Sequence, residues 1–483
     1  MRKPWIRATT LGCCLVLAGC ADMQGLDQMP RARAHSPQDY GATPVQWPGL
    51  FHPGARYEDP ALDALLSEAL QGNPDLSQAR DRLMQAQAYA EEAGAARLPT
   101  LNLEGSAQAR RYAAEYDAGP PLAGAHGMAA VLGVQAGYTF DFWGGQRAAM
   151  RAALGEAAAA EGEWRAARLL LVCRLQRGWF ELAGLLVAQT QTREGLELRR
   201  QTLELVRMRR AAGLDTDVQV AQARADVSAS LREGAALAQQ IGLQRHALAA
   251  LAGLPLHRLA HAAPALPQPL ALALPPALPA ELIAQRPEVV AARWRVEAAG
   301  QRMQAAKAAF YPNIDLRLFA GLARQSATFG LRDWLHAGSR QYGIEPAISL
   351  PLFDGGRLRA RWKGRAAQFD EAVHGYNQAL LVAVRDVADQ VLSLQALATQ
   401  RAEQGRSLQA RQRAFALARA QYQAGLADYL TVLTAQDALL RDRRLALDLQ
   451  IQTVTRRVEL ERALGGSLIA AAPENRKENK HDD

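Results

Sequence analysis

Residues 422–436 read Tyr-Gln-Ala-Gly-Leu-Ala-Asp-Tyr-Leu-Thr-Val-Leu-Thr-Ala-Gln, and they separate two long stretches that contain no proline. The pattern predicts one helix that ends there and another that begins there, so the chain must reverse its direction at Gly425. Glycine adopts the positive φ of such a reversal without a steric penalty. Asp428 stands beside the start of the returning helix, where a carboxylate is favourable. The segment therefore predicts the turn of a long helical hairpin.

The turn at Gly425 has an earlier copy in the chain, and so do four other features. Ala212-Gly213-Leu214 matches Ala424-Gly425-Leu426, and Asp215 follows the first turn as Asp428 follows the second. The other pairs are Asn73-Pro74 with Arg286-Pro287, Leu98-Pro99 with Tyr311-Pro312, Phe142-Trp-Gly-Gly145 with Phe353-Asp-Gly-Gly356, and Leu251-Ala-Gly253 with Leu464-Gly-Gly466. All five occur in the same order at separations of 211 to 213 residues, which indicates a tandem duplication.

Each copy predicts a helix, two strands, a long helix, a turn and a returning helix. In the first repeat, 60–253, we expect a helix at 60–97, strands at about 99–110 and 130–142, and helices at about 146–211 and 215–252. In the second repeat, 286–466, we expect a helix at 287–309, strands at about 312–321 and 343–353, and helices at about 357–423 and 427–464. The remaining segments are 1–19, an N-terminal segment at 20–59, a Pro-rich connector at 254–285 and a polar tail at 467–483.

The middle helix of each repeat would be about 100 Å long at 1.5 Å per residue. The apolar stripes of such helices must be buried against neighbouring helices of the same kind. The expected fold class is therefore mixed but mostly α, with long antiparallel coiled coils and a few strands.

The four predicted strands alternate between apolar and polar residues. Leu101 and Leu103 alternate with Asn102 and Glu104, and the same pattern recurs in the other three strands. Each run has about the 9–11 residues that a tilted strand needs to cross a membrane, although a half-buried sheet in a soluble domain would show the same alternation. Four strands cannot close a barrel, so a membrane barrel would be shared between chains. Two copies would contribute eight strands and three would contribute twelve, and polar inner faces favour the wider barrel.

The N-terminus carries the features of an export signal. Basic residues precede the short apolar run from Leu11 to Ala18, which is too short to span a bilayer. The run ends in Leu17-Ala-Gly-Cys20, which resembles the lipobox of bacterial lipoproteins; the alternative is an ordinary signal peptide. The resemblance implies cleavage before Cys20, acylation of Cys20, and, because Ala21 is not Asp, transfer to the outer membrane.

Composition and motifs argue against an enzyme and against a nucleic-acid partner. The net charge is +8, but Lys and Arg are scattered rather than clustered. We find no nucleotide-binding, zinc-protease or serine-hydrolase motif, and we predict no cofactor and no metal site. His257 and His261 have helical metal-ligand spacing, but they lie in the Pro-rich connector without a companion Cys or Glu motif. A pore-less periplasmic coiled-coil adaptor or scaffold, and an envelope enzyme, remain as alternative classes.

The lipobox, the duplication, the paired strands with a Phe-x-Gly-Gly exit and the long helices together resemble the TolC/OprM family of outer-membrane efflux channels, and most of all its NodT-like lipoproteins. The resemblance covers nearly the whole mature chain. It implies a homotrimer with a twelve-stranded barrel in the outer-membrane lipid of a Gram-negative bacterium, and a twelve-helix tunnel in the periplasm. It also implies two partners, a periplasmic adaptor protein and an inner-membrane pump, usually of the resistance-nodulation-division class.

The resemblance also assigns roles to the two hairpin turns, which in this family narrow the tunnel and dock the adaptor. The positions that match the docking ends are Gly213, Leu214, Asp215, Tyr422, Gly425, Leu426 and Asp428. Where the family often carries acidic residues beyond the second turn, this chain has Thr431 and Thr434. The candidate gate residues are therefore Leu430, Thr431, Thr434 and Asp437.

Overall fold

The computed structural model describes residues 30–43, 57, 59–115, 120–267, 280–326 and 337–466, and it divides into two compact units. Unit 1 contains Leu83–Ala160, Ala292–Tyr376 and the described residues of the N-terminal segment up to Ala34. Unit 2 contains His35–Arg82, Glu161–Ala291 and the described residues after Tyr376. No helix within the described ranges combines the length and the apolar content that crossing a membrane requires.

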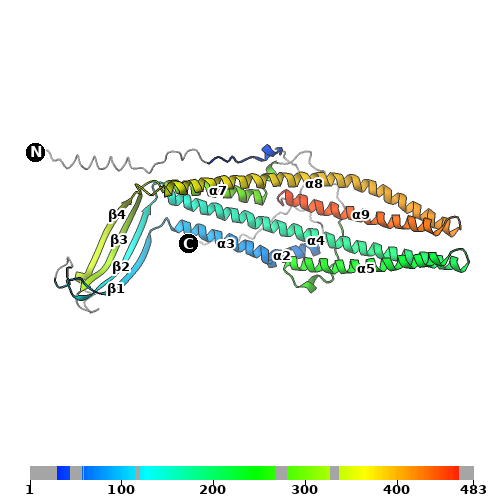
Figure 1. Ribbon diagram of the computed structural model, residues 1–483, viewed down its shortest axis with the longest axis horizontal. Coiled ribbons are helices and arrows are strands. Elements are labelled where there is room, and N and C mark those ends of the chain that lie inside the picture. The colour runs from blue at the N-terminus through cyan, green and yellow to red at the C-terminus, as the bar shows by residue number, and fades with distance from the viewer. Residues whose placement is uncertain are drawn as a thin grey trace, which may run out of the picture. The chain divides into compact units, whose positions relative to one another are not determined.

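The order of the elements follows the two expected repeats (Figure 1). The first repeat contains α2 (Pro60–Gly72), α3 (Pro74–Ala95), β1 (Thr100–Arg111), β2 (His126–Phe140), α4 (Gly145–Ala211) and α5 (Asp217–Ala252). The second contains α7 (Pro287–Ala308), β3 (Asn313–Ser326), β4 (Arg340–Ser349), α8 (Arg357–Gln423) and α9 (Tyr429–Ala463), and α6 (Ala280–Ala284) precedes it in the segment expected as the connector. Short 3-10 helices lie at Pro37–Tyr40, Leu256–Leu259 and Ala337–Ser339.

The stretch expected as one helix at 60–97 forms two helices, α2 and α3, which are separated at Asn73. Pro74 cannot donate a backbone hydrogen bond, so it suits the first position of a new helix. The buried Asn73 stabilises the break in two ways. Its Oδ1 accepts from the backbone N–H of Leu76 at 2.8 Å, and its Nδ2 donates to the carbonyl of Leu251 at 2.7 Å. The break therefore ties the start of α3 to the end of α5.

The four strands of unit 1 form one antiparallel sheet in the order β1-β2-β3-β4, with the strands side by side in Figure 1. The register places Leu103 opposite Val134, Val134 opposite Ala320, and Ala320 opposite Tyr342, all from the apolar set of the alternation. The adjacent row joins Asn102, Gln135, Phe319 and Gly343 on the other face. The predicted division into an apolar and a polar face therefore extends across the whole sheet, with Phe319 as an apolar exception.

Phe319 is accommodated on the polar face because a glycine lies beneath it. A Cβ atom added to Gly133 would come within 2.6 Å of the Phe319 ring. Gly133 is paired with Gly321 in the register, and a Cβ atom on Gly321 would come within 2.4 Å of the β2 backbone. These two glycines permit the close approach of β2, β3 and the aromatic ring.

Each pair of strands passes to its long helix through a glycine turn that an aspartate caps. Gly144 and Gly355 have φ values of +74° and +66°. Asp141 accepts from the backbone N–H groups of Gln146 and Arg147, and Asp354 accepts from those of Gly356 and Leu358. These bonds satisfy backbone donors at the start of α4 and α8 that have no partner inside the helix.

Aromatic side chains gather around the same junction of unit 1. The Trp143 ring stacks on Tyr311 with centroids 4.6 Å apart, and its Nε1 donates to the carbonyl of Pro312 at 2.8 Å. Phe140 stacks on Phe142 at 5.6 Å. Phe142 and Phe353 are largely exposed.

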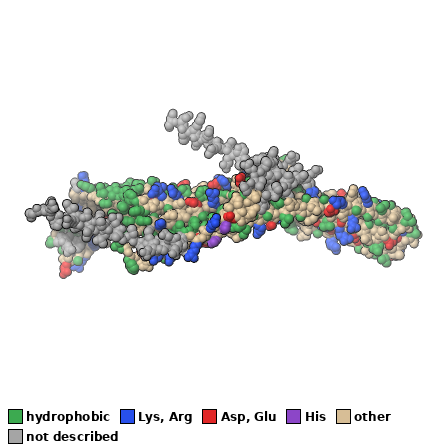
Figure 2. Space-filling view, turned by 90° about the horizontal axis from the view of Figure 1, so that it is seen from above, with side chains coloured by type: hydrophobic (Ala, Val, Ile, Leu, Met, Phe, Trp, Pro, Cys, Tyr) green, Lys and Arg blue, Asp and Glu red, His purple; other side chains and the backbone are tan. Residues whose placement is uncertain are grey.

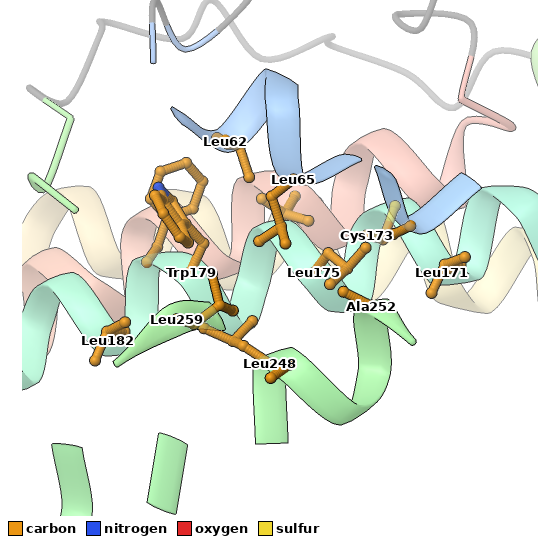
Figure 3. Packing of buried hydrophobic residues seen from close by; sticks show 14 of the residues in the cluster. Leu62, Leu65, Leu171, Cys173, Leu175, Trp179, Leu182, Leu248, Ala252 and Leu259 are labelled. Carbon is orange, nitrogen blue, oxygen red and sulfur yellow. The ribbon is translucent and has the colours of Figure 1, made fainter. Parts of the chain in front are cut away.

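Unit 2 has its largest core where α2 lies across α4 and α5 (Figure 3). Buried side chains from these elements and from the 3-10 helix after α5 meet there, including Leu62, Leu65, Leu171, Cys173, Leu175, Trp179, Leu182, Leu248, Ala252 and Leu259. Trp179 Nε1 donates to the Asp59 carboxylate at 2.7 Å, and Asp59 also caps α2. The core is thus continuous from the start of α2 to the end of α5.

To the right of this core in Figure 1, unit 2 contains two helical hairpins, the C-terminal part of α4 with α5 and the C-terminal part of α8 with α9. Small residues on α4 let the hairpins approach closely, since a Cβ atom on Gly184 would lie 2.2 Å from Ile451 of α9. Basic, acidic and apolar side chains are interspersed over the helices in the view of Figure 2. The outer helix faces therefore carry no extended patch of one charge in that view.

Candidate functional site at the ends of two helical hairpins

The two turns of unit 2 have the same backbone geometry. Gly213 and Gly425 have φ values of +76° and +78°. In the first turn, the N–H of Gly213 donates to the carbonyl of Arg210 and the N–H of Leu214 donates to that of Arg209. The second turn repeats these bonds from Gly425 to Tyr422 and from Leu426 to Gln421. This is the Schellman motif, in which a residue with positive φ ends a helix, as the sequence predicted for both glycines.

The side chains at the turns divide into exposed leucines and a helix cap. Leu214 is 64% exposed and Leu426 is 80% exposed, so the described part of the chain leaves both largely uncovered. Asp428 is the N-cap of α9, where its carboxylate accepts from the backbone N–H of Thr431 at 2.9 Å and from its hydroxyl at 2.6 Å. These hydrogen bonds from Thr431 lower the pKa of Asp428.

Asp215 does not cap α5, although its position beside the helix start suggested a role like that of Asp428. Thr216 is the N-cap of α5 and forms a capping box with Gln219. The Asp215 carboxylate, only 5% exposed, turns instead toward Arg209 of α4 and Tyr422 of α8. The two aspartates therefore have different roles, although they occupy similar positions in the two repeats.

Arg209, Asp215 and Tyr422 form the first polar bridge between the hairpins. The Tyr422 hydroxyl donates to Asp215, whose carboxylate also lies 3.2 Å from Arg209 Nε. Arg209 donates in turn to the backbone carbonyl of Tyr422 at 3.1 Å, and its guanidinium lies 4.4 Å from the centre of the Tyr422 ring. Burial and the hydrogen bond to Asp215 raise the pKa of Tyr422 above its usual value. The bridge joins residues that are 207 positions apart in the chain.

A second bridge lies further along the helices and is centred on Arg199. Arg199 donates to the Asp437 carboxylate of α9 at 2.9 Å, and to the Asp226 carbonyl and the Ser230 hydroxyl of α5. The Tyr429 hydroxyl lies 3.4 Å from the Asp226 carboxylate. Burial raises the pKa of Asp226. Asp437, a candidate gate residue, is therefore engaged in holding α9 against the first hairpin.

An apolar cluster lies alongside the two bridges and contains residues of all four helices. Its buried members are Leu203, Val206, Val220, Ala223, Phe415, Tyr422, Tyr429, Val432 and Leu439. We call this cluster, together with the two bridges, the seam. Because the seam buries apolar surface from both hairpins, separating them exposes that surface to water.

The other candidate gate residues lie on the opposite side of α9 from the seam. Leu430 is 64% exposed, and Thr431 and Thr434 are also exposed. The Thr434 hydroxyl donates to the carbonyl of Leu430 at 2.7 Å, one turn earlier in the same helix. The structure brings these residues together on one surface of α9 and places no other element of the described chain over them.

Sequence reasoning missed Arg199, Arg209, Asp226 and Tyr429. Arg209 had one available signal, because cations favour the last turn of a helix. Arg199 and Asp226 lie inside helices at positions where no local pattern marks them, and Tyr429 is the first residue of α9, where its place in the turn segment did not indicate its partner. Within the described ranges, no group of three or more His, Cys, Asp or Glu side chains is arranged to hold a metal ion.

Comparison with known proteins connects this architecture to a family. Residues 65–254 and 278–466 match the family described as outer membrane efflux protein. The chain belongs to this family. The two matched segments correspond closely to the two repeats, and an outer-membrane efflux channel accounts for both the sheet with one apolar face and the long helical hairpins.

Individual relatives of this efflux channel align over most of their length. The chain is 32% identical to the multidrug resistance outer membrane protein MdtP of Shigella flexneri, over 95% of this chain and 96% of the relative. It is 35% identical to the fusaric acid resistance protein FusA of Burkholderia cepacia, over 77% of this chain and 73% of the relative. The crystal structure of the outer membrane protein VceC from Vibrio cholerae superposes with a TM-score of 0.80 at 37% identity, over 85% of this chain and 97% of VceC.

These similarities confirm the predicted fold class, the outer-membrane location and the efflux function. The pore-less periplasmic scaffold, which the sequence left open, receives no support from them. The family consists of channel proteins rather than known enzymes.

Proposed function

We propose that this channel is the exit duct of a tripartite efflux system and that it works as a homotrimer. The observation that carries the proposal is the register of the sheet, which places the apolar residues of all four strands on one face. Within the described residues, β1 and β4 each pair with one neighbour only, so both edges are free to pair with other copies. Three copies contribute twelve strands, enough for a water-filled lumen lined by the polar face.

The hairpin ends are the proposed docking surface for a periplasmic adaptor. Leu214 and Leu426 offer exposed apolar contacts, and Asp428 adds a charge beside the second turn. The sequence contains no nucleotide-binding motif, so energy must come from a partner, for which an inner-membrane pump of the resistance-nodulation-division class is the proposal. Leu430, Thr431 and Thr434 are proposed to line the narrow entrance, which widens when the seam opens and Asp437 leaves Arg199.

The membrane anchor and the substrate complete the proposal. Cys20 lies outside the described residues, and we propose that it carries the lipid anchor that its lipobox indicates. MdtP and FusA are named for resistance to multiple drugs and to fusaric acid. Toxic organic compounds are therefore the first class of substrate to test.

The test combines assembly with export. The purified protein should require detergent and have the mass of three chains in analytical ultracentrifugation. Expressed with its adaptor and pump in a strain that lacks outer-membrane efflux channels, it should lower drug susceptibility. Cysteine at Leu426 should cross-link to the adaptor, whereas cysteine at the exposed Leu256, far from the turns in sequence, should not. A water-soluble monomer, or unchanged susceptibility with all three proteins present, would contradict the proposal.

A further inference from the structure

Gln436 is a polar side chain buried inside the seam. It is 1% exposed and lies on α9 between Val432 and Leu439, at positions i−4 and i+3. Residues at these separations share one face of a helix, and both neighbours belong to the apolar cluster. Gln436 therefore faces the same packed interior as the cluster residues of α4, α5 and α8.

The side-chain nitrogen of Gln436 is not satisfied by the described part of the protein. Its Nε2 is buried and has no hydrogen-bond partner among the described residues. The adjacent Asp437 carboxylate is engaged by Arg199, and the buried Ser230 hydroxyl of the same region accepts from Arg199. A buried donor without a partner loses its hydrogen bonds to water and regains none on packing. The closed seam is therefore less stable than it would be with an apolar side chain at this position.

The cost of this burial depends on whether the hairpins are packed together. When the seam opens, water reaches the amide and restores its hydrogen bonds. Exposure of Val432 and Leu439 to water, in contrast, is unfavourable, because they lose the free energy of apolar burial. The apolar cluster and the two bridges favour the closed seam, and Gln436 acts against them. A side chain of this kind sets the balance between closed and open states instead of maximising stability.

We propose that Gln436 shifts the equilibrium of the seam toward its open state. Its unpaired side-chain nitrogen destabilises the packed hairpins and so raises the population of the open channel. The inference rests on the proposed function, because it assumes that export requires the two hairpins to separate. It concerns a positioning residue, since Gln436 is buried and acts through the packing of α9.

The experiment replaces Gln436 by methionine, which has a similar length and volume but no donor. A matched control is Gln176 of α4, which is also buried and also has an unpartnered side-chain atom, Oε1. Gln176 is 35 residues from Ala211, the last residue of α4 before the turn, about 53 Å at 1.5 Å per residue. Gln176→Met thus repeats the chemical change far from the turn.

We expect both variants to raise the temperature of thermal unfolding of the full-length protein in detergent. In single-channel recordings, Gln436→Met should lower the ratio of open to closed time about tenfold, and Gln176→Met should leave it unchanged. Gln436→Leu should reproduce the effect of Gln436→Met if the missing donor, rather than the shape of methionine, is the cause. Export through the adaptor and pump should fall for the Gln436 variants alone.

The outcomes separate this inference from the function on which it rests. If the wild type neither conducts nor exports, the proposed function fails and the inference fails with it. If the wild type exports and the Gln436→Met channel has the same ratio of open to closed time as the wild type, only the inference is overturned. A lower unfolding temperature for both Gln436→Met and Gln436→Leu would also overturn it, because the amide would then be satisfied in the closed seam.

Discussion

Tyr422 joins the two hairpins through its hydroxyl, its ring and its backbone carbonyl. The hydroxyl donates to Asp215, while the ring and the carbonyl both contact Arg209. Because the side chain is fully buried, removing one atom removes one interaction without opening the site to water. The first bridge can therefore be tested one hydrogen bond at a time.

Tyr422→Phe should weaken the first bridge and make the channel open more often. A hydrogen bond to a charged group contributes about 1.5–3 kcal/mol, and Asp215 retains Arg209, so we expect a loss near the lower value. Denaturant unfolding and single-channel recordings measure the two effects. Tyr429→Phe is the control, because its longer contact of 3.4 Å with Asp226 should contribute less. An equal decrease in the free energy of unfolding for the two variants would show that the Tyr422–Asp215 hydrogen bond contributes no more than the Tyr429–Asp226 contact.

Glu461 gives unit 2 a dependence on pH. Burial raises the pKa of Glu461 to about 7, although Arg457 and the hydrogen bond from Tyr57 oppose the shift. A carboxyl with a raised pKa in the folded state binds its proton more tightly than in the unfolded state, so stability falls as pH rises from about 4.5 to about 7. The difference between the two pKa values corresponds to at most about 3 kcal/mol.

Replacing Glu461 by glutamine should remove this dependence. We expect the unfolding temperature of the wild type to fall between pH 5 and pH 8 and that of Glu461→Gln to change less. Glu403, an exposed residue of α8, offers a control, because Glu403→Gln should leave the pH profile unchanged. The same slope in wild type and Glu461→Gln would assign the pH dependence to another group.

At the scale of elements, the hairpin turns depend on backbone conformation rather than on space. A Cβ atom added to Gly425 would meet no atom within 4 Å, but its φ of +78° disfavours any residue with a side chain, and β-branched residues most. The same holds for Gly213. A substitution there strains the turn without disturbing the packing around it.

Gly425→Val should therefore abolish export while the trimer still assembles, because the sheet lies in the other unit. Drug susceptibility measured together with membrane levels of the trimer decides this. Gly405→Val is the matched control, since Gly405 lies inside α8, has open space around it and needs no positive φ. Full export by Gly425→Val at normal abundance would show that this turn is not part of the functional end.

The two faces of the sheet should respond differently to charge. Leu103 and Gln135 belong to adjacent rows of the register, at nearly the same depth but on opposite faces. Leu103→Arg places a cation on the proposed lipid face, which costs about 2–4 kcal/mol near the middle of the membrane, whereas Gln135→Arg faces the lumen. The folded trimer recovered from membranes should decrease for the first variant only. Equal amounts of folded trimer for the two variants would contradict the assignment of the apolar face to lipid.

For the whole molecule, assembly and anchoring rest on different parts of the chain. The sheet carries its own apolar face, so insertion does not depend on the lipid anchor proposed at Cys20. Cys20→Ala should abolish acylation and block processing, while trimers still form. Mass spectrometry of the mature N-terminus checks this, and an unmodified, unprocessed N-terminus in the wild type would refute the anchor.

Local sequence patterns were sufficient to predict the features that depend on neighbouring residues. The period of two in the strands, the turns at Gly213 and Gly425 and the long helices all follow from residues close together in the chain. The duplication supports these predictions, because each pattern occurs twice at nearly the same separation of 211 to 213 residues. The N-cap at Asp428 was predictable for the same reason, since an N-cap bonds only to its own helix.

Contacts between residues far apart in the chain could be seen only once the helices were packed together. The helix break at Asn73 has a local signal in Pro74, but its contact with the carbonyl of Leu251 does not, and the role of Asp215 depends on Tyr422 from the other repeat. Arg199 and Gln436 became functional candidates only when α9 packed against the first hairpin. For a side chain inside a helix, no local signal identifies its partner. The same helical spacing occurs on a solvated face, in a core and in a polar bridge, and only the packing of a second helix distinguishes them.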